Sequence, residues 1–389
     1  MSAEDPPHAS TPPAPALKLN LLTAPRAAPA PAAADAKPAD TGTNDTSPKK
    51  AAPAASDAEA NAPHIALFLP LASKNFAKVA DAIRLGFIAG ALADGKNAAA
   101  YRIYTTDDEV GSLAALYRKA VADGAVAIVA GFTRDGANTI ARESRFLPTL
   151  ALNAPLAASE NDLPEKFFYV SLNLDLEARL VARMAFNDGL RNAALLVANN
   201  ALAKRIQDSF EKEWQKAGGE LVSTIAFSTD PSDASRISRA FEKLADKVDL
   251  VFLAADPAAA RFIRPYLPTG MPVFATSHTV DPRAEAVANL DLDNVRYLDM
   301  PWFVEQDHPA VMAYAKPVES LPVEVERLYA LGIDAWRLMQ VVTKSSNVRN
   351  IAPLDGVIGR LSLDGHQFVR QLSAVEVRDG RSQRTSRRE

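Results

Sequence analysis

Short apolar runs recur along the chain at fairly even intervals, and each is followed by a segment with apolar residues at helical spacing. The seven runs lie at residues 65–69, 101–105, 125–130, 149–152, 193–198, 250–254 and 273–276. Runs that are bounded by turn residues and alternate with amphipathic helices are typical of βα units, whose parallel strands are buried on both faces. The pattern therefore predicts an α/β fold, in which ligands usually bind along the edge where the strands end.

The alternation of predicted strands and helices is interrupted once and then begins again, which predicts two lobes. The aromatic segment 167–172 is expected to cross into the second lobe, where a fresh series begins at residue 193. Two similar α/β lobes with more than one crossing are the architecture of type I periplasmic binding proteins. We predict this fold for residues 63–377, with lobe 1 at about 63–170 plus 280–377 and lobe 2 at about 171–279.

One long helix is predicted at residues 322–342, after the chain has returned to the first lobe. Apolar residues cover most of its circumference, and only a narrow polar stripe of Arg327, Asp334 and Arg337 remains. A helix that is apolar almost all round is buried, so we expect this one to lie nearly inside the lobe.

The two ends of the chain differ in composition from the predicted lobes. Residues 1–60 hold 11 of the 27 prolines, and no aromatic residue (Phe, Trp or Tyr) precedes Phe68. Such a segment buries too little apolar surface to offset its ordering entropy, so residues 1–62 are predicted to be a disordered Pro/Ala-rich linker. Residues 378–389 hold five arginines and are predicted to be a basic disordered tail.

Charge and cysteine content exclude several classes of protein. The net charge is −4 and the charges are well mixed, so no nucleic-acid-binding face is expected. The absence of cysteine excludes disulfides, thiol catalysis and Cys-based zinc sites. No apolar run reaches the length of a transmembrane helix, and the given sequence shows neither a signal peptide nor a lipobox cysteine.

The usual enzyme motifs are missing from the sequence. There is no G-x-S-x-G elbow, no G-x-G-x-x-G after a strand, no P-loop and no H-E-x-x-H, and the five histidines lack metal-ligand spacing. Ser277 and His278 are adjacent on an expected strand end, where they point to opposite faces and make a poor nucleophile–base pair. We therefore expect no catalytic residue, no cofactor and no metal, and a hydrolase is the least favoured class.

The candidate ligand-binding residues are those that follow the predicted strands, because such positions converge in a two-lobed α/β protein. They are Leu71, Ser73, Phe132, Thr133, Arg134, Asn153, Asn199, Asp256 and Ser277. Thr133 and Asn153 offer hydrogen bonds, and Arg134 offers a partner for a carboxylate. For each residue taken alone, helix capping or surface solvation is the favoured alternative.

Four stretches of the sequence carry a family resemblance. They are IALFLPL at 65–71, AIRLGF at 82–87, FLAADP at 252–257 and, above all, LYALGIDAWRL at 328–338. Residues 64–377 resemble the penicillin-binding protein activators, the LppC-type outer-membrane lipoproteins of Gram-negative bacteria. The first stretch and GVIGRLSL at 356–363 are also similar to the branched-chain amino-acid binding proteins of ABC transporters.

The resemblance implies a noncatalytic protein of the periplasm that is associated with the outer membrane. Its expected partner is a class A, bifunctional penicillin-binding protein, whose peptidoglycan cross-linking it would stimulate. The alternative is a solute-binding receptor of an ABC transporter for amino acids or similar small polar ligands, which the residues around Phe132 and Asn153 favour.

Overall fold

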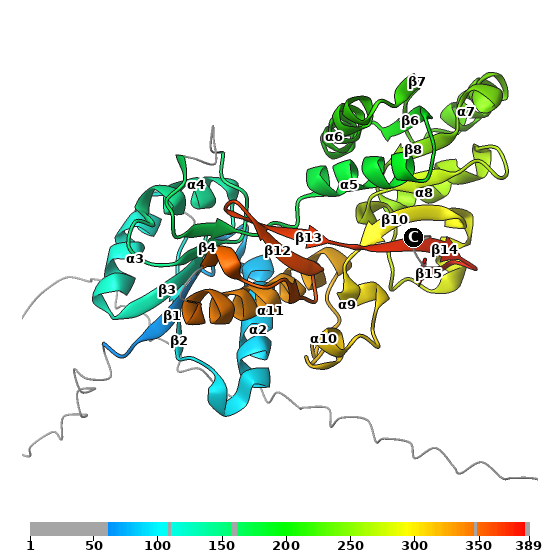
Figure 1. Cartoon of the computed structure of the whole chain (residues 1–389). Coiled ribbons are helices and arrows are strands. Elements are labelled where there is room, and N and C mark those ends of the chain that lie inside the picture. The colour runs from blue at the N-terminus through cyan, green and yellow to red at the C-terminus, as the bar shows by residue number, and fades with distance from the viewer. Residues whose placement is uncertain (1–60, 108–109, 157–161, 346–347, 386–389) are drawn as a thin grey trace, which may run out of the picture. The chain divides into compact units, whose positions relative to one another are not determined.

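A computed structural model describes residues 61–107, 110–156, 162–345 and 348–385. Within these residues the strands form two sheets, one eight-stranded and one seven-stranded, and most neighbouring strands in each are parallel (Figure 1). The predicted α/β fold is confirmed. Nearly all of the predicted linker 1–62 lies outside the described residues and stays a prediction.

The first sheet has the strand order β11-β12-β13-β5-β4-β3-β1-β2. Its strands are β1 (His64–Leu69), β2 (Tyr101–Thr105), β3 (Ala125–Ala130), β4 (Thr149–Ala151), β5 (Phe167–Tyr169), β11 (Leu354–Asp355), β12 (Arg360–Asp364) and β13 (Gln367–Gln371). Its helices are α2 (Ala77–Asp94), α3 (Val110–Ala122), α4 (Arg134–Glu143) and α11 (Val323–Lys344).

Helices cover both faces of the first sheet. Along β1, Ile65, Leu67 and Leu69 pack with side chains of α2 and α11, whereas Ala66 and Phe68 pack with α3 and α4. Successive side chains of a strand point to opposite faces, so a strand between two helical layers is apolar at every position. This burial explains why the first apolar run is continuous.

The second sheet has the order β15-β14-β10-β9-β8-β6-β7. Its strands are β6 (Asn192–Ala198), β7 (Glu220–Phe227), β8 (Leu250–Ala254), β9 (Val273–Ala275), β10 (Val295–Asp299), β14 (Ser373–Arg378) and β15 (Arg381–Arg384). The helices that contribute to its core are α5 (Leu174–Asn187), α6 (Ala201–Ala217), α7 (Pro231–Leu244) and α8 (Pro257–Ile263). Short helices α9 (Pro301–Val304) and α10 (Pro309–Met312) follow β10.

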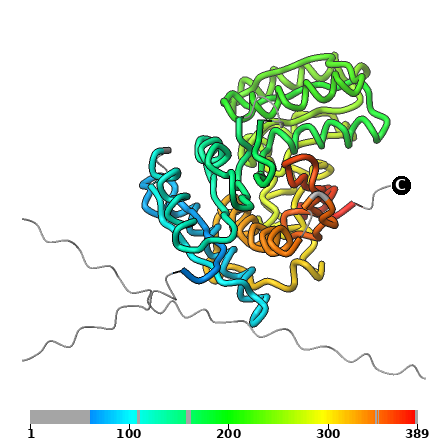
Figure 2. The backbone as a smooth tube through the Cα atoms, turned by 60° about the vertical axis from the view of Figure 1, so that its left-hand side comes forward, coloured from blue at the N-terminus to red at the C-terminus, as the bar shows by residue number. Residues whose placement is uncertain are grey.

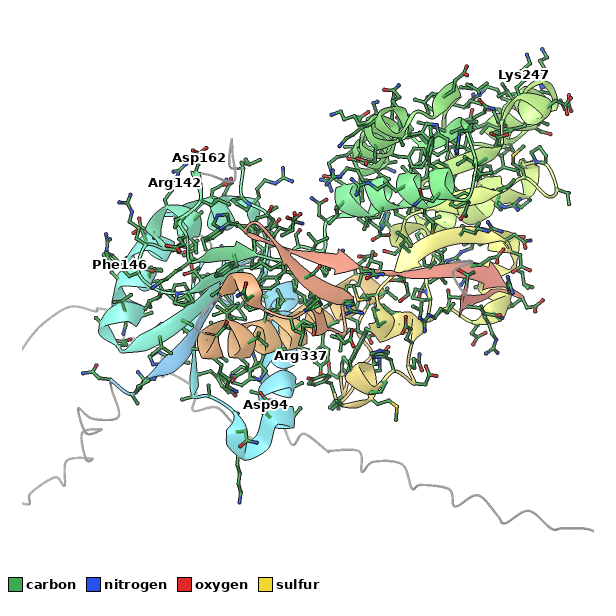
Figure 3. The ribbon with its side chains drawn as sticks, viewed as in Figure 1. Asp94, Arg142, Phe146, Asp162, Lys247 and Arg337 are labelled. Carbon is green, nitrogen blue, oxygen red and sulfur yellow. The ribbon has the colours of Figure 1, made fainter. Side chains whose placement is uncertain are left out.

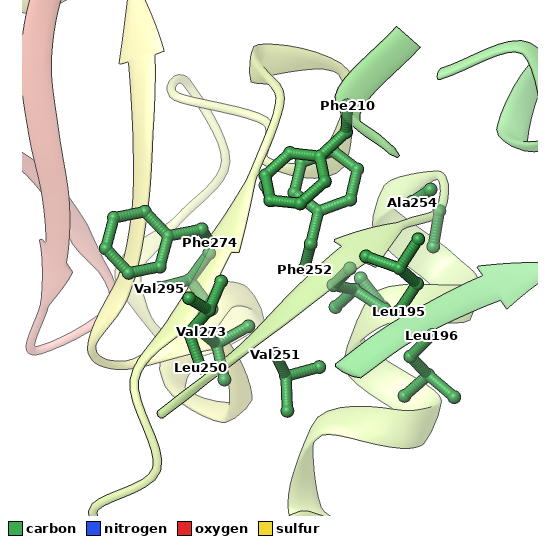
Figure 4. Packing of buried hydrophobic residues seen from close by; sticks show 14 of the residues in the cluster. Leu195, Leu196, Phe210, Leu250, Val251, Phe252, Ala254, Val273, Phe274 and Val295 are labelled. Carbon is green, nitrogen blue, oxygen red and sulfur yellow. The ribbon is translucent and has the colours of Figure 1, made fainter. Parts of the chain in front are cut away.

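Aromatic stacking fixes α6 on the second sheet. The rings of Phe210 on α6 and Phe252 on β8 stack with their centroids 3.9 Å apart (Figure 4). Local signals set the ends of α6: the Asn200 side chain accepts a hydrogen bond from the Ala203 amide, and Gly218 ends the helix with a φ of 95°.

The long helix α11 is nearly buried, as predicted, and it packs closely against α2. Gly86 and Gly332 make this approach possible, because a Cβ atom on Gly332 would lie 2.2 Å from the carbonyl oxygen of Ile83. The polar stripe is also more deeply buried than its composition suggests: Arg327 is 6% exposed and Asp334 is fully buried. The Asp334 carboxyl group accepts a hydrogen bond from the Ile358 amide and pairs with Arg337 Nη1 at 3.0 Å, and both contacts offset the cost of its burial.

The two sheets do not divide the chain at the predicted lobe boundary. In the described part of the chain the backbone passes between the sheets three times: after β5, after β10 and between β13 and β14. Residues 295–299, predicted in lobe 1, form β10, which pairs with β9 of the second sheet. Residues 373–377 belong to β14, which pairs with β10. A strand's apolar pattern does not specify which sheet the strand joins. The pattern alone therefore could not show that residues 295–299 and 373–377 belong to the second sheet.

The predicted disordered tail is wrong for part of its length. Residues 381–384 form β15, an edge strand that pairs antiparallel with β14. Tyr297 on β10 reaches across to it, and its hydroxyl lies 2.6 Å from Ser382 Oγ. Arginines are acceptable on such a strand because charged side chains are common on exposed sheet edges.

Candidate functional site

Three of the predicted loops lie together at the carboxyl edge of the first sheet. They follow β1, β3 and β4, and β3 is hydrogen-bonded between the other two. The Asn153 side-chain amide donates to the carbonyl oxygen of Phe132 at 3.1 Å. The Phe132 ring meets that of Phe76 edge to face, with centroids 5.8 Å apart. The structure therefore brings Phe132 and Asn153 into contact.

Several other predicted residues at this edge contact neighbouring parts of the chain. The Thr133 hydroxyl accepts a hydrogen bond from the Gly136 amide and caps α4. The Ser73 hydroxyl accepts from the amides of Asn75 and Phe76, and Leu71 packs against the core. Arg134 is exposed and forms no salt bridge with a described residue. The capping alternative thus describes Thr133, whereas Arg134 is free to meet an anion.

The second sheet presents the remaining three candidates after β6, β8 and β9. Asp256 caps α8 by accepting hydrogen bonds from the amides of Ala258 and Ala259. Asn199 is exposed, and it is the next residue, Asn200, that caps α6. Ser277 is buried, and its hydroxyl donates to Glu177 Oε2 at 3.1 Å. Among the described residues, no hydrogen bond or salt bridge joins these three to the first-sheet candidates.

A group of buried charges, which was not predicted from the sequence, lies at the three passages between the sheets. We call it the crossing cluster: Glu177, Asp299, Arg327 and Arg370. Glu177 lies in the first turn of α5, Asp299 ends β10, and Arg370 lies one residue before β13 ends. Ser277 is the one predicted residue that contacts the cluster. Its backbone amide and its hydroxyl both donate to Glu177.

The strongest pairing in the crossing cluster joins the two sheets. The Arg327 guanidinium, on α11, donates to both carboxylate oxygens of Asp299, with Nη2 3.1 Å from Oδ2. Burial by itself would lower the pKa of Arg327, but the charge of Asp299 outweighs it and raises the pKa. Arg327 therefore stays charged at every accessible pH.

The other two members of the cluster are less well paired. Arg370 is fully enclosed, and its best contact is from Nη1 to the Ile358 carbonyl oxygen at 3.4 Å. Burial lowers the pKa of Arg370 to about 10, against the nearby charge of Glu177. Burial raises the pKa of Glu177 to about 7, although Arg327 and the Ser277 amide favour the charged form. Glu177 is therefore poised to change charge near neutral pH.

The Arg327–Asp299 pair of this cluster joins a helix of the first sheet to a strand of the second. No group of three or more His, Asp or Glu side chains able to hold a metal ion occurs among the described residues. No helix in the described ranges is long and apolar enough to cross a membrane. A sequence signal did exist for one member of the cluster, because Arg327 is a charged residue on a helix predicted to be buried.

Comparison with known proteins identifies a family that matches most of the chain. A family model described as LppC putative lipoprotein matches residues 57–380. Penicillin-binding protein activator LpoA of Enterobacter sp. (strain 638) is 25% identical over 299 residues, covering 66% of this chain and 41% of that protein. LpoA of Yersinia pseudotuberculosis is 25% identical over 325 residues, covering 72% and 48%. The chain thus spans less than half the length of these relatives.

Two solved structures show the same fold. Full-length LpoA from Haemophilus influenzae has a TM-score of 0.69 at 21% identity, covering 84% of this chain and 59% of that one. A putative branched-chain amino acid ABC transporter protein from Chromobacterium violaceum has a TM-score of 0.68 at 34% identity, covering 80% and 99%.

Proposed function

Because the chain belongs to the LppC putative lipoprotein family, we propose that it is a noncatalytic activator that binds a class A penicillin-binding protein and stimulates peptidoglycan cross-linking. The resemblance inferred from the sequence is confirmed at the level of the family. The family match over residues 57–380 carries the proposal. The curated relatives are named penicillin-binding protein activators, and the structure of a Haemophilus influenzae LpoA C-domain describes it as a regulator of PBP1A.

The arrangement of two sheets linked by three backbone passages supports a regulatory role. Domains joined by such hinges have two discrete arrangements, and a partner that binds one of them more tightly shifts the population towards it. The salt bridge between Arg327 and Asp299 links the sheets in the arrangement described here. We propose that this bond favours one arrangement of the two sheets over the other. The synthase, by binding one arrangement more tightly, would then shift the population between them.

We also propose that the protein works in the periplasm, associated with the outer membrane, as its family's description as putative lipoproteins suggests. The Pro/Ala-rich segment 1–62 then serves as a tether. A tethered domain raises its own concentration near a partner without any new contact.

A reconstituted synthase tests the proposal. The purified chain is titrated into a class A penicillin-binding protein of the same organism with lipid II as substrate, and cross-linked muropeptides are quantified. We expect saturable binding and a rise in the cross-linked fraction, with the heat-unfolded chain as the control. Absence of both binding and stimulation would refute the activator function.

A second function, small-solute binding, is favoured by one specific observation. The chain is 34% identical to the Chromobacterium violaceum protein, described as a putative branched-chain amino acid ABC transporter, over 99% of that protein's length. The first-sheet edge around Phe132 and Asn153 is the proposed site, with Leu71, Ser73, Thr133 and Arg134 beside it. Asn199, Asp256 and Ser277 are the proposed binding residues on the second sheet.

Thermal unfolding with added amino acids tests this second function. A ligand at a hundred times its dissociation constant stabilises the folded chain by roughly 2.7 kcal/mol. We expect Asn153→Ala to abolish any such shift and Asn187→Ala, at the exposed end of α5, to leave it unchanged. If no amino acid changes the unfolding temperature, the receptor function is excluded for this ligand class.

A further inference from the structure

A hollow on the first sheet's α3–α4 side combines an exposed aromatic ring with three arginines. It has a volume of about 400 Å³ and is lined by Tyr117, Arg118, Val121, Arg142, Glu143, Arg145 and Phe146. We call this surface the Phe146 patch. Figure 3 labels Arg142 and Phe146 on this side of the sheet. Phe146 is 72% exposed and Val121 39%, so both present apolar surface to solvent.

The backbone beside Phe146 is held in place by neighbouring groups. The Arg145 amide donates to the Glu143 carbonyl oxygen at 2.8 Å, and the Leu147 amide donates to the Tyr117 hydroxyl at 3.4 Å. Tyr117 itself is 3% exposed. Both residues that flank Phe146 are therefore hydrogen-bonded, which lowers the entropy lost when a partner covers the ring.

The patch carries a local surplus of positive charge. Arg118, Arg142 and Arg145 are exposed, and none forms a salt bridge with a described residue. Arginines elsewhere on the helices are often paired, as Arg183 is with Glu213. Glu143 is the single carboxylate that lines the hollow, while the whole chain has a net charge of −4.

Stabilisation of a helix end explains only part of the Phe146 patch. Arg142 lies in the last turn of α4, where a cation interacts favourably with the helix dipole. Arg145 lies beyond the Ser144 cap, and a large exposed apolar ring does nothing for a helix end. Hot spots of protein–protein interfaces are instead enriched in arginine and aromatic residues, as this hollow is.

We propose that the Phe146 patch docks an acidic segment of the class A penicillin-binding protein, with an apolar side chain of that segment packed on Phe146 and Val121. Guanidinium groups bind carboxylates through paired hydrogen bonds, so three unpaired arginines select an acidic partner. The apolar contact sets the register of the segment. This inference rests on the proposed activator function and names the surface through which it acts.

Binding of the full chain to the purified synthase tests the proposal. One variant is Phe146→Ala, and the second combines Arg118→Glu, Arg142→Glu and Arg145→Glu. The matched control combines Arg239→Glu, Lys243→Glu and Lys247→Glu, which change the charge equally at exposed residues on and after α7; Figure 3 labels Lys247 there. Circular dichroism and unfolding temperature confirm that every variant is folded.

We expect Phe146→Ala to weaken binding at least roughly tenfold, the typical loss for a buried aromatic anchor. The triple Arg variant should lose more and should also lose most of the salt dependence of binding. The control should bind within about twofold of wild type.

Three outcomes would overturn the proposal. If the wild type binds the synthase and both patch variants bind equally well, the patch is not the docking surface, although the activator function stands. If the wild type does not bind the synthase, the docking proposal and the activator function are both refuted. If the patch variants lose binding to vesicles of phosphatidylglycerol while synthase binding is unchanged, the patch meets anionic lipid instead.

Discussion

Arg327 of α11 and Asp299 at the end of β10 form a buried two-point salt bridge, and this bond ties a helix of the first sheet to a strand of the second. The arginine side chain is 8% exposed and the aspartate side chain is fully buried. Asp299 also accepts a hydrogen bond from the Met300 amide at 2.7 Å. Because that strand end leads into a passage between the sheets, the pair lies where the chain crosses from the second sheet to the first.

Replacing Arg327 with methionine should be strongly destabilising. The change leaves the Asp299 carboxylate buried without its cation, which typically costs about 3–5 kcal/mol. Urea denaturation measures the loss. The control is Arg183→Met, whose salt bridge with Glu213 is exposed on the arginine side and should cost less than about 1 kcal/mol. The double variant Arg327→Met with Asp299→Leu should recover part of the loss, and equal losses for Arg327→Met and the control would contradict the assignment.

Glu177 should make stability depend on pH in an unusual direction. Burial raises its pKa to about 7 from 4.5, so the folded state binds the proton more tightly than the unfolded state. The contribution of Glu177 to stability is therefore fully present below about pH 4.5 and is lost as the pH rises through 7. The charged and polar groups that face it are Ser277, Arg327, Asp299 and Arg370.

The measurement is the unfolding free energy of the wild type and of Glu177→Gln between pH 5 and pH 8. We expect the wild type to lose about 3 kcal/mol relative to the variant over this range, from 1.36 kcal/mol per pKa unit. Asp208→Asn, at an exposed position of α6, serves as the control and should run parallel to the wild type. Parallel curves for Glu177→Gln as well would show that Glu177 keeps an ordinary pKa.

Gly332→Ala should disrupt the contact between α11 and α2. The added Cβ would lie 2.2 Å from the Ile83 carbonyl oxygen and 2.8 Å from the Phe87 amide nitrogen, both on the α2 backbone. Overpacking of this kind costs about 1–3 kcal/mol or more. Gly111→Ala is the matched control, because it lies on α3 with nothing within 4 Å of the added atom. There the helix propensity of alanine should be neutral or stabilising by up to about 1 kcal/mol, and thermal unfolding distinguishes the two.

Asp256 offers a way to separate capping from ligand binding. Asp256→Ala should cost about 1 kcal/mol, because the first turn of α8 loses the oxygen that accepts from Ala258 and Ala259. Asp256→Asn keeps the cap and should change stability by less than about 0.5 kcal/mol. If Asp256→Asn nevertheless abolishes a ligand-induced thermal shift, Asp256 contacts the ligand through its charge. If both variants retain the shift, Asp256 is a cap alone.

Much of the fold could be predicted because the strands are buried on both faces. The run at residues 65–69 is apolar at every position since α2 and α11 lie on one side and α3 and α4 on the other. The membership of β10 and β14 could not be predicted in this way. It is set by pairing between residues far apart in the chain, such as Tyr297 with Val375, and the alternation of side chains is the same whichever sheet a strand joins.

The candidate site was predicted only in part, for a related reason. Thr133 and Asp256 follow strands as expected, and the sequence already offered capping as their alternative role. Glu177 and Arg370 gave no comparable signal, because nothing near them in sequence shows that the passages between the sheets enclose them. Asp334 and Arg327 were visible as charges on an apolar helix. Their partners are fixed by tertiary structure, so the pairing could not be read from spacing.

The close packing of α2 on α11 bears on the order in which the parts of the chain fold. Strands β6, β7, β8 and β9 and their helices come from one continuous stretch, so they can assemble without the rest of the chain. Helix α2 precedes this stretch, yet the surface around Gly86 stays uncovered until the distant Gly332 packs on it. We therefore expect the N-terminal βα units to depend on chaperone protection for longer than the middle of the protein does.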